Sequence, residues 1–121
     1  MILENYNYEF AEISNKNYVL NFIESLTDED IAKVFAYIHR LLEIKNLGLR
    51  PKPDFSKYIS QGIYELKVPL KNTTIRLFYF FKSNKLIIFT SGFVKKTQKL
   101  PIIEIEKAIK IKNLYLGEYH D

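Results

Sequence analysis

Residues 63–93 read IYELKVPLKNTTIRLFYFFKSNKLIIFTSGF, and this stretch decides the fold. It contains three segments rich in β-branched and aromatic residues, at 63–68, 75–82 and 85–93. Pro69 and the polar residues that follow it separate the first two segments, and Ser83-Asn84 separates the last two. Segments of this kind, joined by short polar turns, predict three consecutive antiparallel strands.

The residues before this stretch predict one further strand and two helices. Residues 5–13 alternate roughly between aromatic or apolar and polar side chains, which is typical of a strand. Asn17 can cap a short helix. Thr27, followed by three acidic residues, can cap a longer helix that ends at Gly48.

Residues 49–60 contain two prolines and several polar residues, and we expect them to form a connection without regular structure. Pro101 suits the first position of a last helix over residues 101–115. The expected order is β-α-α-β-β-β-α, an α+β fold in which an antiparallel sheet packs against helices. The 121 residues suit a single domain, residues 1–121.

The composition argues against several classes of protein. The chain has no cysteine, and its two histidines, His39 and His120, are far apart, so we expect neither a metal site nor a cofactor. No apolar run approaches the length of a membrane span, and residues 1–5 lack the order of a secretory signal. We therefore expect a soluble cytoplasmic protein that does not bind a membrane.

Charge is distributed unevenly along the chain. Residues 66–103 hold eight cations and no acid, whereas residues 1–30 hold seven acids and the single base Lys16. The eight cations are Lys67, Lys71, Arg76, Lys82, Lys85, Lys95, Lys96 and Lys99. Such a surface attracts a polyanion, and the aromatic rings between the cations can stack on exposed bases. A basic face that only keeps the protein soluble is the alternative.

Arg76 lies inside a segment that is apolar enough to be a central strand. It either forms a structural salt bridge with Glu65 or points at a phosphate, to which its guanidinium can donate two hydrogen bonds. Side chains alternate across a sheet, so Arg76 shares a face with Phe78 and Phe80, while Tyr79 lies on the other face. We expect Tyr79 in the core and Phe78 or Phe80 on a surface that stacks on bases.

Lys95-Lys96-Thr97 directly follows the last predicted strand. A lysine pair in a loop is most often solvated surface. Next to Arg76 and Lys67, however, it would complete a cationic cleft.

Four blocks of this sequence resemble the HigB-type, phage-derived branch of the RelE/ParE toxin superfamily. They are Gly62–Val68, Ile75–Phe80, Gly92–Pro101 and Glu104–Ala108. The resemblance implies a RelE-like fold and the toxin of a type II toxin–antitoxin pair, commonly an mRNA endonuclease that acts on the translating ribosome. It also implies a cognate antitoxin, often a helix-turn-helix protein, and hence either a monomer or an antitoxin-bound hetero-oligomer.

The resemblance assigns catalytic positions to this chain. Arg76 matches the strand arginine of the family, Lys67 a basic position that is more often arginine, and Lys95 with Lys96 the basic pair after the last strand. The chain departs from the family at Leu100, where the family usually has threonine.

RNA can be cleaved without a metal if the adjacent 2′-hydroxyl attacks the phosphate. Arg76 could then stabilise charge, whereas Lys67, Lys95 and Lys96 could lower one another's pKa until one of them serves as a base. Glu65 is the other candidate base, or a structural partner of Arg76. The expected RNA contacts are Lys71, Lys82, Phe78, Phe80, Thr97 and Lys99.

Two other functions remain open at this point. ParE-type members of the superfamily share the fold but inhibit DNA gyrase without RNA chemistry. The third possibility is a phage-derived RNA-binding protein that has lost the cleavage activity.

Overall fold

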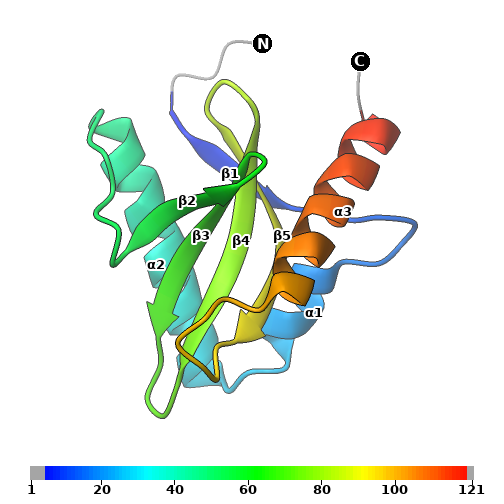
Figure 1. The fold of residues 1–121 in the computed structure, drawn as a ribbon. Coiled ribbons are helices and arrows are strands. Elements are labelled where there is room, and N and C mark those ends of the chain that lie inside the picture. Colours follow the sequence, from blue (N-terminus) through cyan, green and yellow to red (C-terminus); the bar gives the residue numbers. More distant parts are fainter. Residues whose placement is uncertain (1–4, 120–121) are drawn as a thin grey trace.

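The computed structural model describes residues 5–119 as a five-stranded sheet that is covered by helices on both faces (Figure 1). The strands are β1 (Asn7–Phe10), β2 (Ser56–Ser60), β3 (Ile63–Pro69), β4 (Thr74–Ser83) and β5 (Leu86–Val94). The helices are α1 (Tyr18–Glu24), α2 (Asp28–Asn46) and α3 (Ile102–Tyr119). The α+β class and the three central strands of the predicted meander are confirmed.

The strand order in the sheet is β1-β5-β4-β3-β2. Strands β2 to β5 pair in an antiparallel manner, and β1 pairs parallel to β5. The strand β4 therefore lies in the middle of the sheet, and β2 forms one edge. Within the described residues, no helix is long and apolar enough to cross a membrane.

Two apolar clusters fill the spaces on either side of the sheet. On one side, alternate residues of β4 such as Leu77 and Tyr79 pack against α1 and α2. On the other side, Phe78 and Phe80 pack with residues of α3, among them Tyr115. The predicted alternation along β4 is confirmed, and helices cover both faces of the sheet.

The helix boundaries follow the capping residues. The side chain of Asn17 accepts a hydrogen bond from the Leu20 amide, and that of Thr27 accepts one from the Asp30 amide. The helix α2 ends just before Gly48, whose φ of +73° lies in the left-handed region that favours glycine. Both predicted N-caps and the predicted stop are confirmed.

The expectation that residues 49–60 form a connection is wrong for the second half of that range, because β2 begins at Ser56. This strand is short and polar, and it lies at the sheet edge, so it carries no long apolar run. A two-residue turn, Gln61-Gly62, joins it to β3 with φ values of +47° and +83°, as a type I′ hairpin requires. The register of β2 is thereby tied to that of β3.

Candidate active site

Arg76 and Glu65 form a buried ion pair on the face of the sheet that α3 covers. Arg76 lies opposite Lys67 in the neighbouring strand, and Glu65 lies opposite Phe78, so the two charged side chains are diagonal neighbours. The Nη1 atom of Arg76 is 3.6 Å from the Oε1 atom of Glu65. Arg76 is 8% exposed and Glu65 is 1% exposed. The predicted salt bridge therefore exists.

This ion pair has much unused hydrogen-bonding capacity. Neither carboxylate oxygen of Glu65 has a hydrogen-bond partner in the described protein, and neither do Nε and Nη1 of Arg76. Buried charges cost free energy unless hydrogen bonds satisfy them, so an incompletely bonded pair contributes little to the stability of the fold. The guanidinium is therefore held in place by charge, and its Nε and Nη1 donors are buried without an acceptor.

Arg76 also lines an open cleft together with the lysine pair that follows β5. The cleft has a volume of about 500 Å³ and is lined by Thr73, Thr74, Arg76, Lys95, Lys96, Thr97 and Gln98. The backbone amide of Lys95 donates a hydrogen bond to the carbonyl of Thr74, which ties the loop to the start of β4. The hydroxyl of Thr97 donates to the carbonyl of Lys99 and so shapes the same loop. The structure thus brings Arg76, Lys95, Lys96 and Thr97 together.

The pKa of Lys95 is lowered from its usual value. Partial burial of the ammonium group is the largest cause, and the positive charge of Arg76 is the next. Lys67 and Lys57 lower it further, whereas Glu65 acts in the opposite direction. A lysine whose pKa is lowered loses its proton more easily than a free lysine, so a larger fraction of it is neutral and able to act as a base.

Lys57 is a member of this cationic group that the sequence did not reveal. It lies on β2 directly opposite Glu65, and therefore on the same face of the sheet as Arg76. Residues 49–60 were expected to lack regular structure, so Lys57 could not be placed on any face. The aromatic Tyr58 beside Lys57 was the only available signal.

Lys67 belongs to the charge cluster but not to the walls of the cleft. Its Cα is paired with that of Arg76, yet Lys67 is absent from the cleft lining and lines a different cavity together with Arg40 and Phe55. Its charge still acts on Lys95.

The expected stacking surface of Phe78 and Phe80 is wrong. Both rings are buried between the sheet and α3, where Phe78 contacts Phe93 and Phe80 contacts Tyr115. A residue that is enclosed in this way cannot stack on a base without unfolding its surroundings. Tyr79 is buried, as expected.

Of the other expected RNA contacts, Thr97 lines the cleft, whereas Lys71, Lys82 and Lys99 do not. The ammonium group of Lys82 lies 5.5 Å from the ring centre of Tyr115, at the opposite end of β4 from Arg76. Lys71 is exposed in the turn between β3 and β4, and Lys99 is exposed in the loop before α3. Of the histidines, His39 is exposed on α2 and contacts Tyr8, whereas His120 lies outside the described residues.

The described part of the chain contains no group of three or more histidine, aspartate or glutamate residues that could hold a metal ion. Comparison with curated proteins gives no match. The model of the family "Phage derived protein Gp49-like (DUF891)" matches residues 21–113, most of the chain and all of the cleft. The family is of the RelE/HigB toxin type and implies the toxin of a toxin–antitoxin pair, with an antitoxin as partner. The chain therefore belongs to the Gp49-like family of phage-derived proteins.

Proposed function

We propose that this protein is a ribosome-dependent mRNA endonuclease, with the cleft around Arg76, Lys95 and Lys96 as its active site. The observation that carries the proposal is the meeting of the buried guanidinium with two ammonium groups in one cleft. A concave site that focuses positive charge attracts the phosphates of RNA and orients them.

The proposed reaction uses the 2′-hydroxyl of the substrate as nucleophile and needs no metal. Lys95 takes the proton of that hydroxyl, because it lines the cleft with Arg76 and its lowered pKa increases the fraction of neutral amine. Arg76 remains charged and stabilises the negative charge that develops on the phosphate, as preorganised donors do in other active sites. Lys96 binds a neighbouring phosphate and can deliver a proton to the leaving 5′-oxygen.

Glu65 has a different role in this proposal. It is the acidic residue of the cluster, and it is almost fully enclosed. Its carboxylate holds Arg76 in place and is a positioning group, because a substrate in the cleft could not reach it directly. Lys57 and Lys67 act at longer range by raising the local positive potential.

The experiment is to map transcript 5′ ends in cells after a short pulse of expression. We expect new ends in translated transcripts with the native chain, and none with Arg76→Ala or with Lys95 and Lys96 both replaced by glutamine. The matched control is Lys33→Gln, which removes an exposed cation from α2, away from the cleft. Cleavage that persists with the cleft variants, or that disappears with Lys33→Gln, contradicts the proposal.

The second candidate is RNA binding without cleavage, and the lysine at position 67 favours it. A lysine is a point charge where the related toxins more often have the two-pronged guanidinium. In that case, RNA binding should weaken steeply with salt while no new ends appear. The proposed cognate antitoxin, a helix-turn-helix protein, should suppress either activity.

A further inference from the structure

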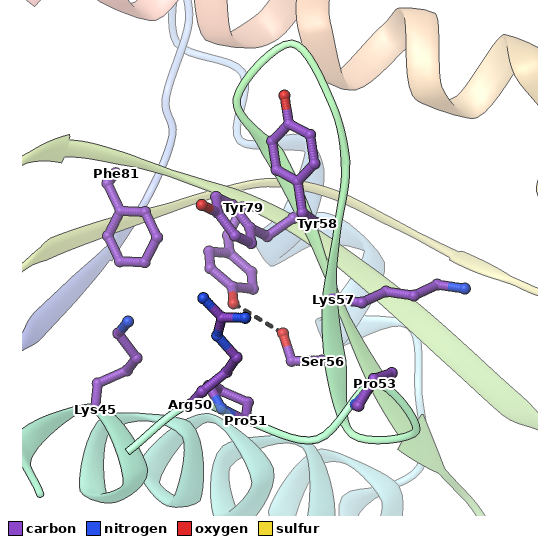
Figure 2. Close-up of a pocket in the computed structure, with 10 residues that line it drawn as sticks. Lys45, Arg50, Pro51, Pro53, Ser56, Lys57, Tyr58, Tyr79 and Phe81 are labelled. Carbon is purple, nitrogen blue, oxygen red and sulfur yellow. Dashed lines mark hydrogen bonds between the residues drawn. The ribbon is translucent and has the colours of Figure 1, made fainter. Parts of the chain in front are cut away.

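A second cavity, of about 410 Å³, lies on the face of the sheet opposite to Arg76 (Figure 2). It is formed by the edge strand β2, the strands β3 and β4, and the chain at the end of α2. Its lining combines aromatic rings with cations, namely Tyr58, Tyr64, Tyr79, Phe81, Lys45 and Arg50. The proposed cleavage reaction makes no use of this cavity.

Aromatic rings form a continuous row across three strands on this face. The ring centres of Tyr58 and Tyr64 are 5.2 Å apart, and those of Tyr64 and Tyr79 are 5.4 Å apart in a stacked arrangement. Tyr79 is buried at the inner end of the row, whereas Tyr58 at the sheet edge is 56% exposed. The row therefore leaves aromatic surface open to a flat ligand at its outer end.

Two cations lie beside this row of rings, one in the last turn of α2 and one in the chain that follows it. Figure 2 shows Lys45 and Arg50 directed toward the rings of Phe81 and Tyr79. The ammonium group of Lys45 lies 5.3 Å from the ring centre of Phe81. Neither cation has a carboxylate within 4.0 Å among the described residues. The cavity is thus positively charged and has no internal counter-ion there.

The inner wall also offers a hydrogen-bond acceptor. The hydroxyl of Ser56 donates its one proton to the carbonyl of Glu65, at 2.7 Å. In the 2.8 Å contact between the hydroxyls of Ser56 and Tyr79, Tyr79 must therefore be the donor. The phenolic oxygen of Tyr79 keeps its lone pairs, which can accept a hydrogen bond from an amino group.

We propose that this cavity binds a nucleotide, with the base packed on Tyr58 and Tyr64 and the phosphate held by Lys45 and Arg50. Its volume lies within the range of about 300–1,000 Å³ that is usual for small-ligand sites. An aromatic surface beside unpaired cations matches a planar base joined to an anion. The nucleotide is either a free mononucleotide or one nucleotide of an RNA strand.

The proposal concerns binding on the other face of the sheet and does not rest on the cleavage reaction. It is tested by isothermal titration of the purified full-length chain with 5′-mononucleotides and with a single-stranded 2′-O-methyl oligonucleotide, which cannot be cleaved. Adenosine, inorganic phosphate and a polyglutamate peptide are the comparison ligands. Arg50→Gln removes the exposed positive charge of the cavity. Tyr58→Leu removes the exposed aromatic ring but keeps an apolar side chain at the same position.

We expect Tyr58→Leu to weaken nucleotide binding about 5- to 160-fold, the range that corresponds to the loss of one stacking partner of a base. Arg50→Gln should weaken the binding of the nucleotide and leave the weak binding of adenosine unchanged. The matched control is Lys110→Gln, which removes an exposed cation from α3 on the opposite face and should leave mononucleotide binding unchanged, whereas Lys96→Gln reports any binding in the cationic cleft. Thermal unfolding of each variant checks that the fold is intact.

Comparing the mononucleotides with the oligonucleotide also identifies the source of the nucleotide. Binding of mononucleotides that depends on Arg50 and Tyr58 supports a free nucleotide, and the same dependence seen only with the oligonucleotide supports an RNA strand. The proposal is overturned if no nucleotide probe binds, or if binding depends on Lys96 and not on Arg50 and Tyr58. It is also overturned if polyglutamate alone binds at this cavity, which would indicate an acidic protein partner.

Discussion

Replacing Glu65 and Arg76 singly and together should separate what this pair does for the fold from what it does for the activity. At a distance of 3.6 Å and an effective dielectric constant of about 20, the two charges attract each other by about 4.6 kcal/mol. Glu65→Leu leaves a buried guanidinium beside Lys57, Lys67 and Lys95, all of the same sign. Arg76→Met leaves a carboxylate that is almost fully enclosed.

We expect each single variant to lower the free energy of unfolding by about 3–5 kcal/mol, because breaking a buried pair leaves one charge uncompensated. The double variant removes both charges and keeps apolar volume. Its free energy of unfolding should be close to that of the native protein, or up to about 4 kcal/mol higher. It should nevertheless be inactive, since the guanidinium is gone.

Urea unfolding of the purified proteins measures the free energies, and 5′-end mapping in cells measures the activity. The recovery of stability in the double variant is the decisive result. A double variant as unstable as the sum of the single ones would show that the fold depends on the pair. A stable double variant that still cleaves transcripts would refute the assignment of Arg76 to the reaction.

Three further changes test other parts of the structure. Lys95→Arg keeps the charge but removes the base, and should slow cleavage about 10²-fold or more. In the native protein the cleavage rate should rise with pH until the lowered pKa of Lys95 is passed, so the pH–rate profile should level off below the usual lysine pKa of about 10.4. Phe78→Ala should lower the free energy of unfolding by about 3–5 kcal/mol in urea, because the ring is fully buried; a surface ring would cost almost nothing. Gly92→Ala should cost about 1–3 kcal/mol in the same assay, because the added methyl group would come within 2.6 Å of the Phe22 ring and 2.7 Å of Leu77; an unchanged unfolding curve would show that α1 can move away.

The local signals in the sequence were sufficient for most elements. Asn17 and Thr27 cap their helices through their own side chains, and Gly48 ends α2 through its own backbone conformation. These features depend on neighbours in the chain, so they can be predicted without the tertiary structure. The alternation along β4 is of the same kind.

The errors concern features that depend on distant parts of the chain. Phe78 or Phe80 was expected at the surface because alternation places both on the face opposite to Tyr79, which was expected in the core. Here α3 covers that face with Ala108, Ile111 and Tyr115, and alternation within β4 cannot reveal this. In the same way, β2 is a strand because β3 offers it a partner, and its own polar residues give little indication of it. Lys57 was missed for this reason.

The two-residue hairpin at Gln61-Gly62 fixes the register of β2, and thereby decides which of its side chains lie on each face of the sheet. Ser56, Lys57 and Tyr58 all line the aromatic cavity, but the strand register directs the side chain of Lys57 to the opposite face, on which Glu65 and Arg76 lie. Adding or deleting one residue between β2 and β3 would invert every assignment at once, with the ammonium group turned toward the tyrosines and the phenol toward the arginine. Evolution can therefore adjust the two faces by point substitution along this strand, but a change in length should disable both together.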